Sequence, residues 1–328
     1  MSDDDQTKWI VVAVALASVA LVAFVVILVQ LSRDDGTTAV ETTTTTSTTT
    51  TTTSPTATTE PAATTTTERP DLVVDRIEMS VAGTQRTALT IVPSAPGDSP
   101  LPVVVVLHGL GVNATSMSRA ADWRDAVATH RFAAVFPQGI ADSWNLGPCC
   151  PPASVAGVRD LDFLDELIDG LVEDPALDGD RLYLTGFSNG GLMVYELACR
   201  RSGSFAAVAP MAASNLTGCS PSRPLSLLHQ HADPDPVVPY GGGLGLGSLV
   251  SVRPFPSVPG TVASWAEASG CAMDPVESAD DDVQRFVWSD CADGVEVELV
   301  RVPGRGHQWL NQGGYVSLDE LLDFFDLS

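Results

Sequence analysis

Short β-branched runs alternate with amphipathic stretches from about residue 88 to the end of the chain. Two runs, VVVVL at 103–107 and LSLL at 225–228, are almost continuously apolar, which is typical of central parallel strands covered on both faces. In 160–171, leucine and isoleucine recur at helical spacing. This alternation predicts an α/β domain with a mostly parallel central sheet and helices on both faces. The expected strands are 88–92, 102–107, 132–136, 181–185, 205–209, 225–228 and 295–302, and the expected helices are 115–129, 160–172, 190–201, 261–269 and 318–325.

The chain before this domain divides into an apolar segment and a threonine-rich segment. Residues 9–31 carry no charge and are long enough to cross a bilayer as a helix, which takes about 20 residues. The alternative is a cleaved signal peptide, but its apolar region is normally about 7–15 residues and follows a basic segment, whereas MSDDDQTK is acidic on balance. Threonine-rich sequence with proline cannot bury enough apolar surface to fold and is typical of an extended stalk. We expect a short tail at 1–8, a transmembrane anchor at 9–31, a disordered stalk at 32–69 and a folded domain at 70–328.

The net charge and the cysteines restrict which classes of binding partner and which cellular compartment are expected. A formal net charge of −24 argues against a nucleic-acid partner, because binding phosphates needs a basic face. An even number of cysteines beside a threonine-rich stalk indicates disulfides in a domain outside the cytoplasm. We therefore expect a single-pass protein of the cell membrane with its domain outside the cytoplasm, or a secreted protein if the N-terminal segment is cleaved.

The six cysteines all lie in the folded part, and none belongs to a CxxC pair. Zinc-ribbon and thioredoxin-like sites are therefore not indicated, and the sequence alone does not choose among the many disulfide pairings. Proximity along the chain makes Cys199–Cys219 and Cys271–Cys291 the simplest pairs. Cys149 and Cys150 would then form either a bridge between neighbours or two free thiols.

The strongest chemical signal is the segment Gly186-Phe187-Ser188-Asn189-Gly190. It follows the predicted strand RLYLT and opens the predicted helix GLMVYELA, which is the strand, turn and helix context of a nucleophile elbow. In such a turn the nucleophile has a strained backbone, and close helix and strand neighbours demand glycine on both sides. The alternative is a glycine-rich helix entry with an incidental serine. We interpret Ser188 as a nucleophile at the tip of a strand, with the helix N-terminus aimed at it.

A serine hydroxyl near neutral pH is a poor nucleophile and needs an adjacent base. After a nucleophile elbow, the acid and the histidine follow the serine in chain order. His307 fits the base, because it lies in the glycine-rich loop PGRGHQWL directly after the predicted strand VEVELVRV, where catalytic side chains gather in open α/β sheets. Asp233 and Asp235, in HADPDPVVPY, are both candidates for the acid that orients the imidazole. The spacing to Val238-Pro239 favours Asp235.

A second glycine-containing loop fits the role of an oxyanion hole. His108-Gly109-Leu110-Gly111 ends the run VVVVL and matches a loop that donates one backbone N–H, while the residue after the nucleophile donates the other. The expected donors are therefore the backbone N–H groups of Leu110 and Asn189. His108 itself is expected to be a structural hydrogen-bonding residue beneath the site.

Other segments extend this pattern over the domain: Phe136-Pro137-Gln138-Gly139, Ser143-Trp144-Asn145 with Cys149-Cys150, 160–164, 206–210, 235–240, Trp265 with Gly270-Cys271, and Gly306-His307. From about residue 72 onward the chain thereby resembles the secreted polyhydroxybutyrate depolymerase-like and feruloyl esterase family of α/β-hydrolases. The resemblance implies an α/β-hydrolase fold and hydrolysis of carboxylic esters, of the polyhydroxybutyrate, feruloyl or acetyl type, through an acyl-enzyme and without a metal or cofactor. It also strengthens the assignment of Ser188, Asp235 and His307.

The chain departs from the family pattern before the acid. The usual HG-x-x-D segment has alanine in place of glycine and an added aspartate, which keeps Asp233 as an alternative to Asp235. Trp144, in the SWN segment, is a candidate wall for an aromatic acyl group or a sugar, with a packed tryptophan as the alternative. No appended substrate-binding module is visible, which favours small or soluble esters over an insoluble polymer but leaves both a small-molecule and a polymeric ester open.

Two alternatives come from other functional classes. His229, His231 and Asp233 have the HxHxD pattern of a dinuclear metal site, but such a site needs more histidines downstream, and only His307 remains. His229 and His231 would also share one face of a strand. The second alternative is a non-catalytic cell-surface binding module on a hydrolase scaffold, since fold does not fix function. It requires a broken triad, whereas all the residues of a triad are present here.

Overall fold

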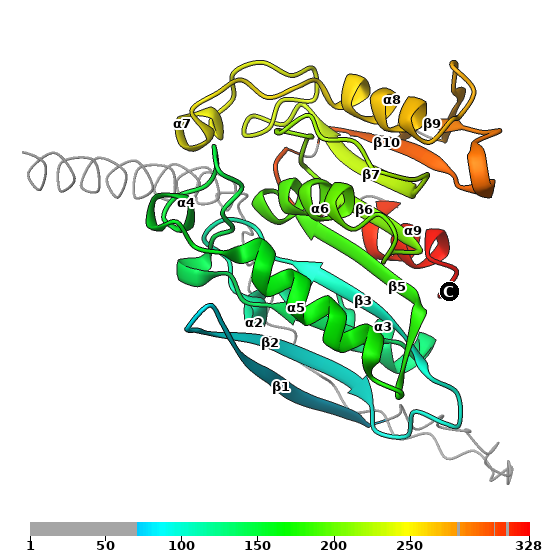
Figure 1. The fold of residues 1–328 in the computed structure, drawn as a ribbon. Helices are drawn as coiled ribbons and strands as arrows, with labels where there is room; N and C mark the ends of the chain where they lie inside the picture. Colours follow the sequence, from blue (N-terminus) through cyan, green and yellow to red (C-terminus); the bar gives the residue numbers. More distant parts are fainter. Residues whose placement is uncertain (1–70, 281–282, 305, 313–314) are drawn as a thin grey trace, which may run out of the picture.

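The computed structural model describes residues 71–280, 283–304, 306–312 and 315–328. In this part of the chain, one large sheet has the strand order β1-β2-β4-β3-β5-β6-β7-β10-β9-β8 (Figure 1). The strands from β4 to β10 in this order run parallel, and an antiparallel pair flanks them at each edge. The strands are β1 (Leu72–Val81), β2 (Thr84–Pro93), β3 (Leu101–Leu107), β4 (Ala133–Pro137), β5 (Leu177–Phe187), β6 (Ala207–Met211), β7 (Ser226–Asp233), β8 (Val276–Asp280), β9 (Val283–Trp288) and β10 (Val297–Pro303), with β11 (Asn311–Gln312) and β12 (Tyr315–Val316) in a separate pair.

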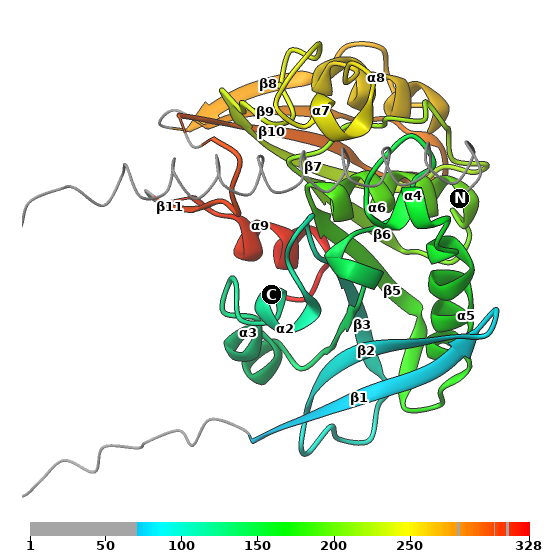
Figure 2. The ribbon, with the colours of Figure 1, turned by 90° about the vertical axis from the view of Figure 1, so that its left-hand side faces the viewer.

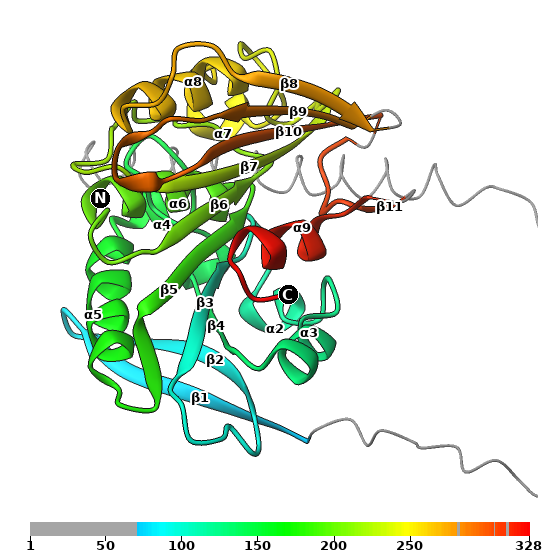
Figure 3. The ribbon, with the colours of Figure 1, turned by 90° about the vertical axis from the view of Figure 1, so that its right-hand side faces the viewer.

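Helices cover both faces of the sheet (Figures 2 and 3). Alternate residues of a buried parallel strand therefore enter two different cores. In β3, Val103 and Val105 belong to the core beneath α5, α6 and α8, whereas Val104 and Val106 belong to the core beneath α2, α3 and α9. The mostly parallel α/β architecture predicted from the sequence is confirmed. The helices are α2 (Ala114–Met117), α3 (Trp123–His130), α4 (Ala153–Ala156), α5 (Asp160–Glu173), α6 (Asn189–Arg200), α7 (Ser248–Ser251), α8 (Val258–Ala268) and α9 (Ser317–Phe324).

The central elements lie close to their predicted positions, but one predicted helix is wrong. Residues 115–129 form two helices, α2 and α3, instead of one. The helical path is interrupted at Ala121 and Asp122, whose φ angles are 110° and 52°. This break lets both Met117 and Trp123 enter the core, at 3% and 0% exposure.

The strands β1, β8 and β9 were not predicted, and each lies toward an edge of the sheet. Every residue of β8 is exposed, and β1 alternates only weakly between exposed and half-buried positions. Strands of this kind carry little of the apolar periodicity from which strands are predicted. The central strand β7 also extends beyond the predicted 225–228, because His229, Gln230 and His231 continue it in buried positions.

The disulfides follow the simplest pairing along the chain. Cys199–Cys219 and Cys271–Cys291 are confirmed, and Cys149 is bonded to Cys150, which is the bridged of the two alternatives. The expected tail, anchor and stalk at 1–69 lie outside the described residues. Within the described ranges, no helix combines the length and apolar character that a membrane crossing requires.

Candidate active site

Ser188 lies in a tight turn between β5 and α6, at the carboxyl end of the parallel sheet. Its φ and ψ are 55° and −119°, a strained backbone conformation that residues other than glycine rarely adopt. The backbone N–H of Ser188 donates to the carbonyl of Met211 at the end of β6, at 3.0 Å, which fixes the turn against the neighbouring strand. The serine is thus presented beyond the sheet edge, as the predicted elbow requires.

Two glycines make this turn sterically feasible. A Cβ on Gly186 would lie 2.7 Å from the backbone of Gly190, and a Cβ on Gly190 would lie 2.3 Å from the carbonyl oxygen of Leu107. Both distances are far below van der Waals contact, and backbone atoms cannot move aside as a flexible side chain can. The glycine requirement inferred from the sequence therefore has a specific cause, which is the close approach of α6 to β5 and β3.

The three expected catalytic side chains are connected by hydrogen bonds. The hydroxyl of Ser188 is 2.8 Å from His307 Nε2, and His307 Nδ1 is 2.7 Å from Asp235 Oδ2. An ionised carboxylate only accepts, so Nδ1 carries the proton and Nε2 accepts from the serine. Burial pushes the pKa of Asp235 upward, but His307, His231 and the backbone N–H of Val238 together hold this pKa below its ordinary value. Asp235 therefore remains a carboxylate at neutral pH.

The alternative acid, Asp233, faces a different partner. Its carboxylate accepts from Arg301 Nε at 2.8 Å and also contacts Arg301 Nη2. Asp233 is still part of β7, in register with β10, which carries Arg301. Asp235 lies beyond the strand end, where its Oδ1 accepts from the backbone N–H groups of Val237 and Val238 at 2.8 and 3.0 Å. Of the two aspartates, only Asp235 contacts His307.

The loop after β3 lies against the nucleophile, as the oxyanion-hole prediction requires. A Cβ on Gly109 would be 3.5 Å from the Cβ of Ser188. Asn189 is the first residue of α6, where backbone N–H groups have no acceptor within the helix. Its side chain is occupied, because Oδ1 accepts from Trp144 N at 2.8 Å and Nδ2 donates to Trp144 O at 3.2 Å. The backbone N–H groups of Leu110 and Asn189 thus lie on two segments that adjoin Ser188.

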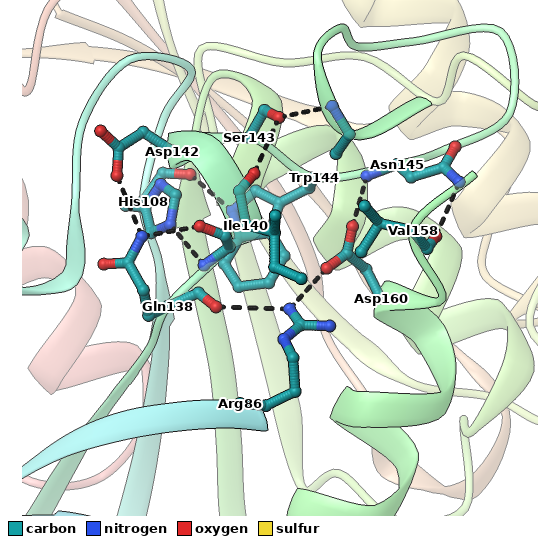
Figure 4. Close-up of polar contacts among 12 residues, drawn as sticks. Arg86, His108, Gln138, Ile140, Asp142, Ser143, Trp144, Asn145, Val158 and Asp160 are labelled. Carbon is teal, nitrogen blue, oxygen red and sulfur yellow. Dashed lines mark hydrogen bonds and ion pairs between the residues drawn. The ribbon is translucent and has the colours of Figure 1, made fainter. Parts of the chain in front are cut away.

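Trp144 is buried beneath these segments and is not open to a substrate. Its exposure is 0%, and its indole Nε1 donates to the carbonyl of His108 at 2.9 Å. The rings of His108 and Trp144 lie 4.8 Å apart, and His108 Nε2 accepts from Gly139 N at 2.9 Å (Figure 4). The structure therefore favours the packed alternative for Trp144, and it places His108 in the expected structural role.

A buried ion pair supports the SWN segment from below (Figure 4). Arg86 Nη2 donates to Asp160 Oδ1 at 2.6 Å, and Asn145 N donates to Asp160 Oδ2 at 2.8 Å. Burial raises the pKa of Asp160, although Asn145 and Arg86 act in the opposite direction. No role was predicted for this pair, because Arg86 and Asp160 are 74 positions apart in the sequence and meet only in the fold.

His229 and His231 do not form the metal site that the HxHxD pattern suggests. Both side chains are fully buried on the face of β7 beneath α6 and α8, and their ring nitrogens make hydrogen bonds with protein groups. Asp233 is paired with Arg301 instead. In the described ranges, no three histidine, cysteine or acidic side chains are grouped so that they could hold a metal ion.

Comparison with known proteins places this site in a family. The family model described as "Esterase PHB depolymerase" matches residues 86–263, which is more than half of the chain. The chain belongs to this family. The matched range includes the loop after β3, the SWN segment, the elbow and Asp235. His307 lies beyond the end of this range. The resemblance inferred from the motifs is thereby confirmed.

Curated relatives of this chain are esterases by name. Feruloyl esterase B of Piromyces equi is 28% identical over 223 residues, which cover 64% of this chain and 40% of the relative. The putative esterase NocK of Nocardia uniformis is 27% identical over 252 residues, which cover 71% of this chain and 73% of the relative. The bifunctional acetylxylan esterase/xylanase XynS20E of Neocallimastix patriciarum is 24% identical, over 63% of this chain and 28% of the relative. The chain thus spans less than half the length of two of these relatives.

A solved structure supports the fold. The acetyl xylan esterase from Aspergillus awamori superposes with a TM-score of 0.56 at 13% identity, covering 77% of this chain and 100% of that chain. Together with the sheet order and the family match, this confirms the α/β-hydrolase fold for this PHB depolymerase-family protein.

Proposed function

We propose that this protein is a serine esterase that hydrolyses carboxylic esters through an acyl-enzyme, with Ser188 as nucleophile, His307 as general base and Asp235 as the acid that orients it. The observation that carries the proposal is the hydrogen-bonded series Ser188–His307–Asp235 at the end of the sheet. Membership of an esterase family supports the same chemistry. The non-catalytic alternative needs a broken triad, and no member of this one is missing.

In the acylation step, Ser188 Oγ attacks the ester carbonyl carbon while its proton passes to His307 Nε2. The tetrahedral oxyanion accepts hydrogen bonds from the backbone N–H groups of Leu110 and Asn189. Asp235 stabilises the imidazolium that forms. Collapse of the intermediate breaks the ester C–O bond, and His307 returns the proton to the leaving alcohol.

Deacylation repeats these steps with water. His307 takes a proton from a water molecule, whose oxygen attacks the acyl carbon, and the same two N–H groups stabilise the second oxyanion. Ser188 leaves with the proton from His307, and the carboxylic acid is released. Every proton transfer uses a side chain of this chain, so the proposed cycle involves no cofactor.

The substrate class proposed is a carboxylic ester of the feruloyl, acetyl or polyhydroxybutyrate type. The names of the relatives motivate this range, since they include a feruloyl esterase and an acetylxylan esterase. Trp144 does not enter this proposal, because it is fully buried. Exposed apolar side chains instead lie in the segment after the acid loop, where Leu244 and Leu249 are 78% and 61% exposed.

The location proposed is the outer side of the cell membrane, with residues 9–31 as anchor and 32–69 as stalk. The uncharged apolar run and the threonine-rich tract motivate this arrangement, and the disulfides of the domain suit an oxidising compartment. Fractionation of cells expressing the full chain tests it. We expect the protein in the membrane fraction and release of the domain when protease is added to intact cells, whereas recovery in the cytosolic fraction would contradict the proposal.

The enzymatic proposal is tested by hydrolysis of chromogenic acetyl, butyryl and feruloyl esters by the full chain in detergent. Ser188→Ala is compared with the matched variant Ser202→Ala, whose hydroxyl forms a hydrogen bond with Ser222 away from the site. We expect Ser188→Ala to lower kcat/KM by on the order of 10³-fold or more, and Ser202→Ala to retain activity. Equal activity of Ser188→Ala and wild type would show that Ser188 is not the nucleophile.

A further inference from the structure

A series of three buried polar side chains leads from α6 through β7 to the proposed triad acid. Tyr195 on α6, and His229 and His231 on β7, are at most 1% exposed. His229 and His231 occupy alternate positions of the strand, so both project toward α6 and α8. Their rings are nearly parallel, with 5.4 Å between centroids. The proposed mechanism uses none of these groups.

The hydrogen bonds in this series have one consistent direction. His231 Nε2 lies 2.9 Å from the carbonyl oxygen of Val238, which can only accept, so Nε2 carries the proton. His231 Nδ1 then has a free lone pair and accepts from His229 Nε2 at 3.1 Å. His229 Nδ1 in turn accepts from the hydroxyl of Tyr195 at 2.7 Å. In this arrangement both rings are neutral, and each is held in a single tautomer.

The pKa values of His229, His231 and Tyr195 agree with neutral rings and a protonated hydroxyl. Burial, with a contribution from the neighbouring His231, holds the pKa of His229 well below its ordinary value. Burial also lowers the pKa of His231 to about 4, although Asp235 and the Val238 carbonyl act in the opposite direction. Burial raises the pKa of Tyr195 well above its ordinary value, so its hydroxyl keeps its proton.

The series ends on the loop that positions Asp235. The backbone of Val238 is held from two sides, because its carbonyl accepts from His231 and its N–H donates to Asp235 Oδ1. His231 Nε2 is also 3.5 Å from Asp235 Oδ2, the oxygen that accepts from His307. Removal of the His231 donor would leave the buried Val238 carbonyl unpaired and release the loop, so Asp235 would lose its alignment with the base.

We propose that Tyr195, His229 and His231 form a neutral positioning relay, in which His231 is the key donor that holds Asp235 in line with His307. The inference rests on the proposed function, since it assigns a role in aligning the proposed triad. It concerns residues that neither touch the substrate nor exchange protons with it. Loss of the relay should therefore lower the rate of the chemical step and leave substrate binding unchanged.

The test compares four variants of the full chain in detergent with p-nitrophenyl acetate as substrate. His231→Leu removes the donor, His231→Gln keeps an amide donor at a similar reach, and Tyr195→Phe removes only the first donor of the relay. Leu228→Val is the matched control, because Leu228 is buried in the same strand but on the opposite face. Thermal unfolding verifies that each variant is folded at the assay temperature.

We expect His231→Leu to lower kcat by about 10- to 100-fold, the range that a displacement of about 1 Å causes in an active site, with KM changed by less than about twofold. His231→Gln should recover most of this loss, Tyr195→Phe should have a smaller effect, and Leu228→Val should have the kcat of wild type. Wild-type kcat in a folded His231→Leu variant, or no recovery in a folded His231→Gln variant, would overturn the proposal.

A spectroscopic measurement separates this inference from the proposed function. The proton between His307 and Asp235 should give a low-field NMR signal that persists in Leu228→Val and is lost or displaced in His231→Leu. If wild type neither hydrolyses esters nor reacts with a fluorophosphonate, the proposed function fails, and this signal still decides whether His231 positions Asp235. An unchanged signal in His231→Leu would overturn the relay regardless of activity.

Discussion

Asp233 and Asp235 are separated by a single residue at the end of β7, yet their carboxylates contact different partners. Asp233 pairs with Arg301 on the adjacent strand β10, whereas Asp235 accepts a hydrogen bond from His307. The difference arises because Asp233 is still held in the strand register, while Asp235 lies in the loop beyond it. The two residues therefore provide a matched pair for testing which carboxylate acts in catalysis.

Asp235→Asn should lower kcat by about 10⁴-fold, because an amide at this position favours the wrong tautomer of His307, the proposed base. Asp233→Asn should change kcat by less than about tenfold. Its pair with Arg301 is partly exposed, so we expect a loss of less than about 1 kcal/mol in the free energy of unfolding. Ester hydrolysis and urea unfolding of both variants check this. The reverse order of activities would assign the acid to Asp233.

The contrast between these aspartates also shows where prediction from the sequence reached its limit. The turn around Ser188 could be predicted because the elbow is a local feature, in which the strand, the turn glycines and the helix are contiguous. The partner of Asp233 could not be predicted, because Arg301 meets it only through pairing of β7 with β10. The sequence therefore left both aspartates as candidates for the acid until the strand register was known.

A similar limit explains the end of β7. The predicted strand stopped at residue 228 because the next residues are polar, but His229 and His231 are buried with hydrogen-bond partners on α6 and in the acid loop. Buried polar residues in a central strand depend on such tertiary partners. The helix break at Ala121 and Asp122 is likewise set by packing of the residues on either side. In contrast, the continuous apolar run of β3 and the helical spacing of apolar residues in α5 were sufficient to predict these two elements.

Stability should depend on pH through His231. Its pKa is lowered to about 4 in the folded protein, against about 6.5 in an unfolded chain, so the unfolded state binds a proton first as the pH falls. Asp235 and Asp233 raise this pKa and His307 lowers it, while His229 contacts the ring through a hydrogen bond. The contribution of neutral His231 to the free energy of unfolding is fully present above about pH 6.5 and is lost as the pH falls toward about 4.

We therefore expect His231 to contribute about 2 kcal/mol to the loss of unfolding free energy between pH 7 and pH 5. Urea unfolding at both pH values measures this loss in wild type and in His231→Gln, which has no titrating group at this position. The variant should lose less stability than wild type over this interval. Leu228→Val is the control that lowers stability without removing an ionisable group, and it should keep the wild-type pH dependence. Identical pH dependence in His231→Gln would contradict the expectation.

Trp144 should stabilise the fold and have no effect on substrate specificity. Trp144→Phe removes the indole donor to the His108 carbonyl and leaves part of a fully buried space unfilled. We expect a loss of about 1–3 kcal/mol in the free energy of unfolding. The ranking of acetyl, butyryl and feruloyl esters by KM should be unchanged, as measured on the folded variant. A selective rise in KM for feruloyl esters would show that the indole contacts the acyl group after all.

The elbow glycines give the most direct test of the geometry at Ser188. In Gly190→Ala, the new Cβ would lie 2.3 Å from the carbonyl oxygen of Leu107, so α6 would have to move away from β3 and carry Ser188 with it. We expect a loss of about 3 kcal/mol or more in the free energy of unfolding and a large fall in kcat. Gly170→Ala on the exposed side of α5 is the matched control, because its Cβ would meet no atom within 4 Å. That variant should gain about 0.5–1 kcal/mol and retain full activity, since alanine is the better residue inside a helix. If both variants unfold alike and hydrolyse esters alike, the close approach of α6 to β3 does not constrain the nucleophile.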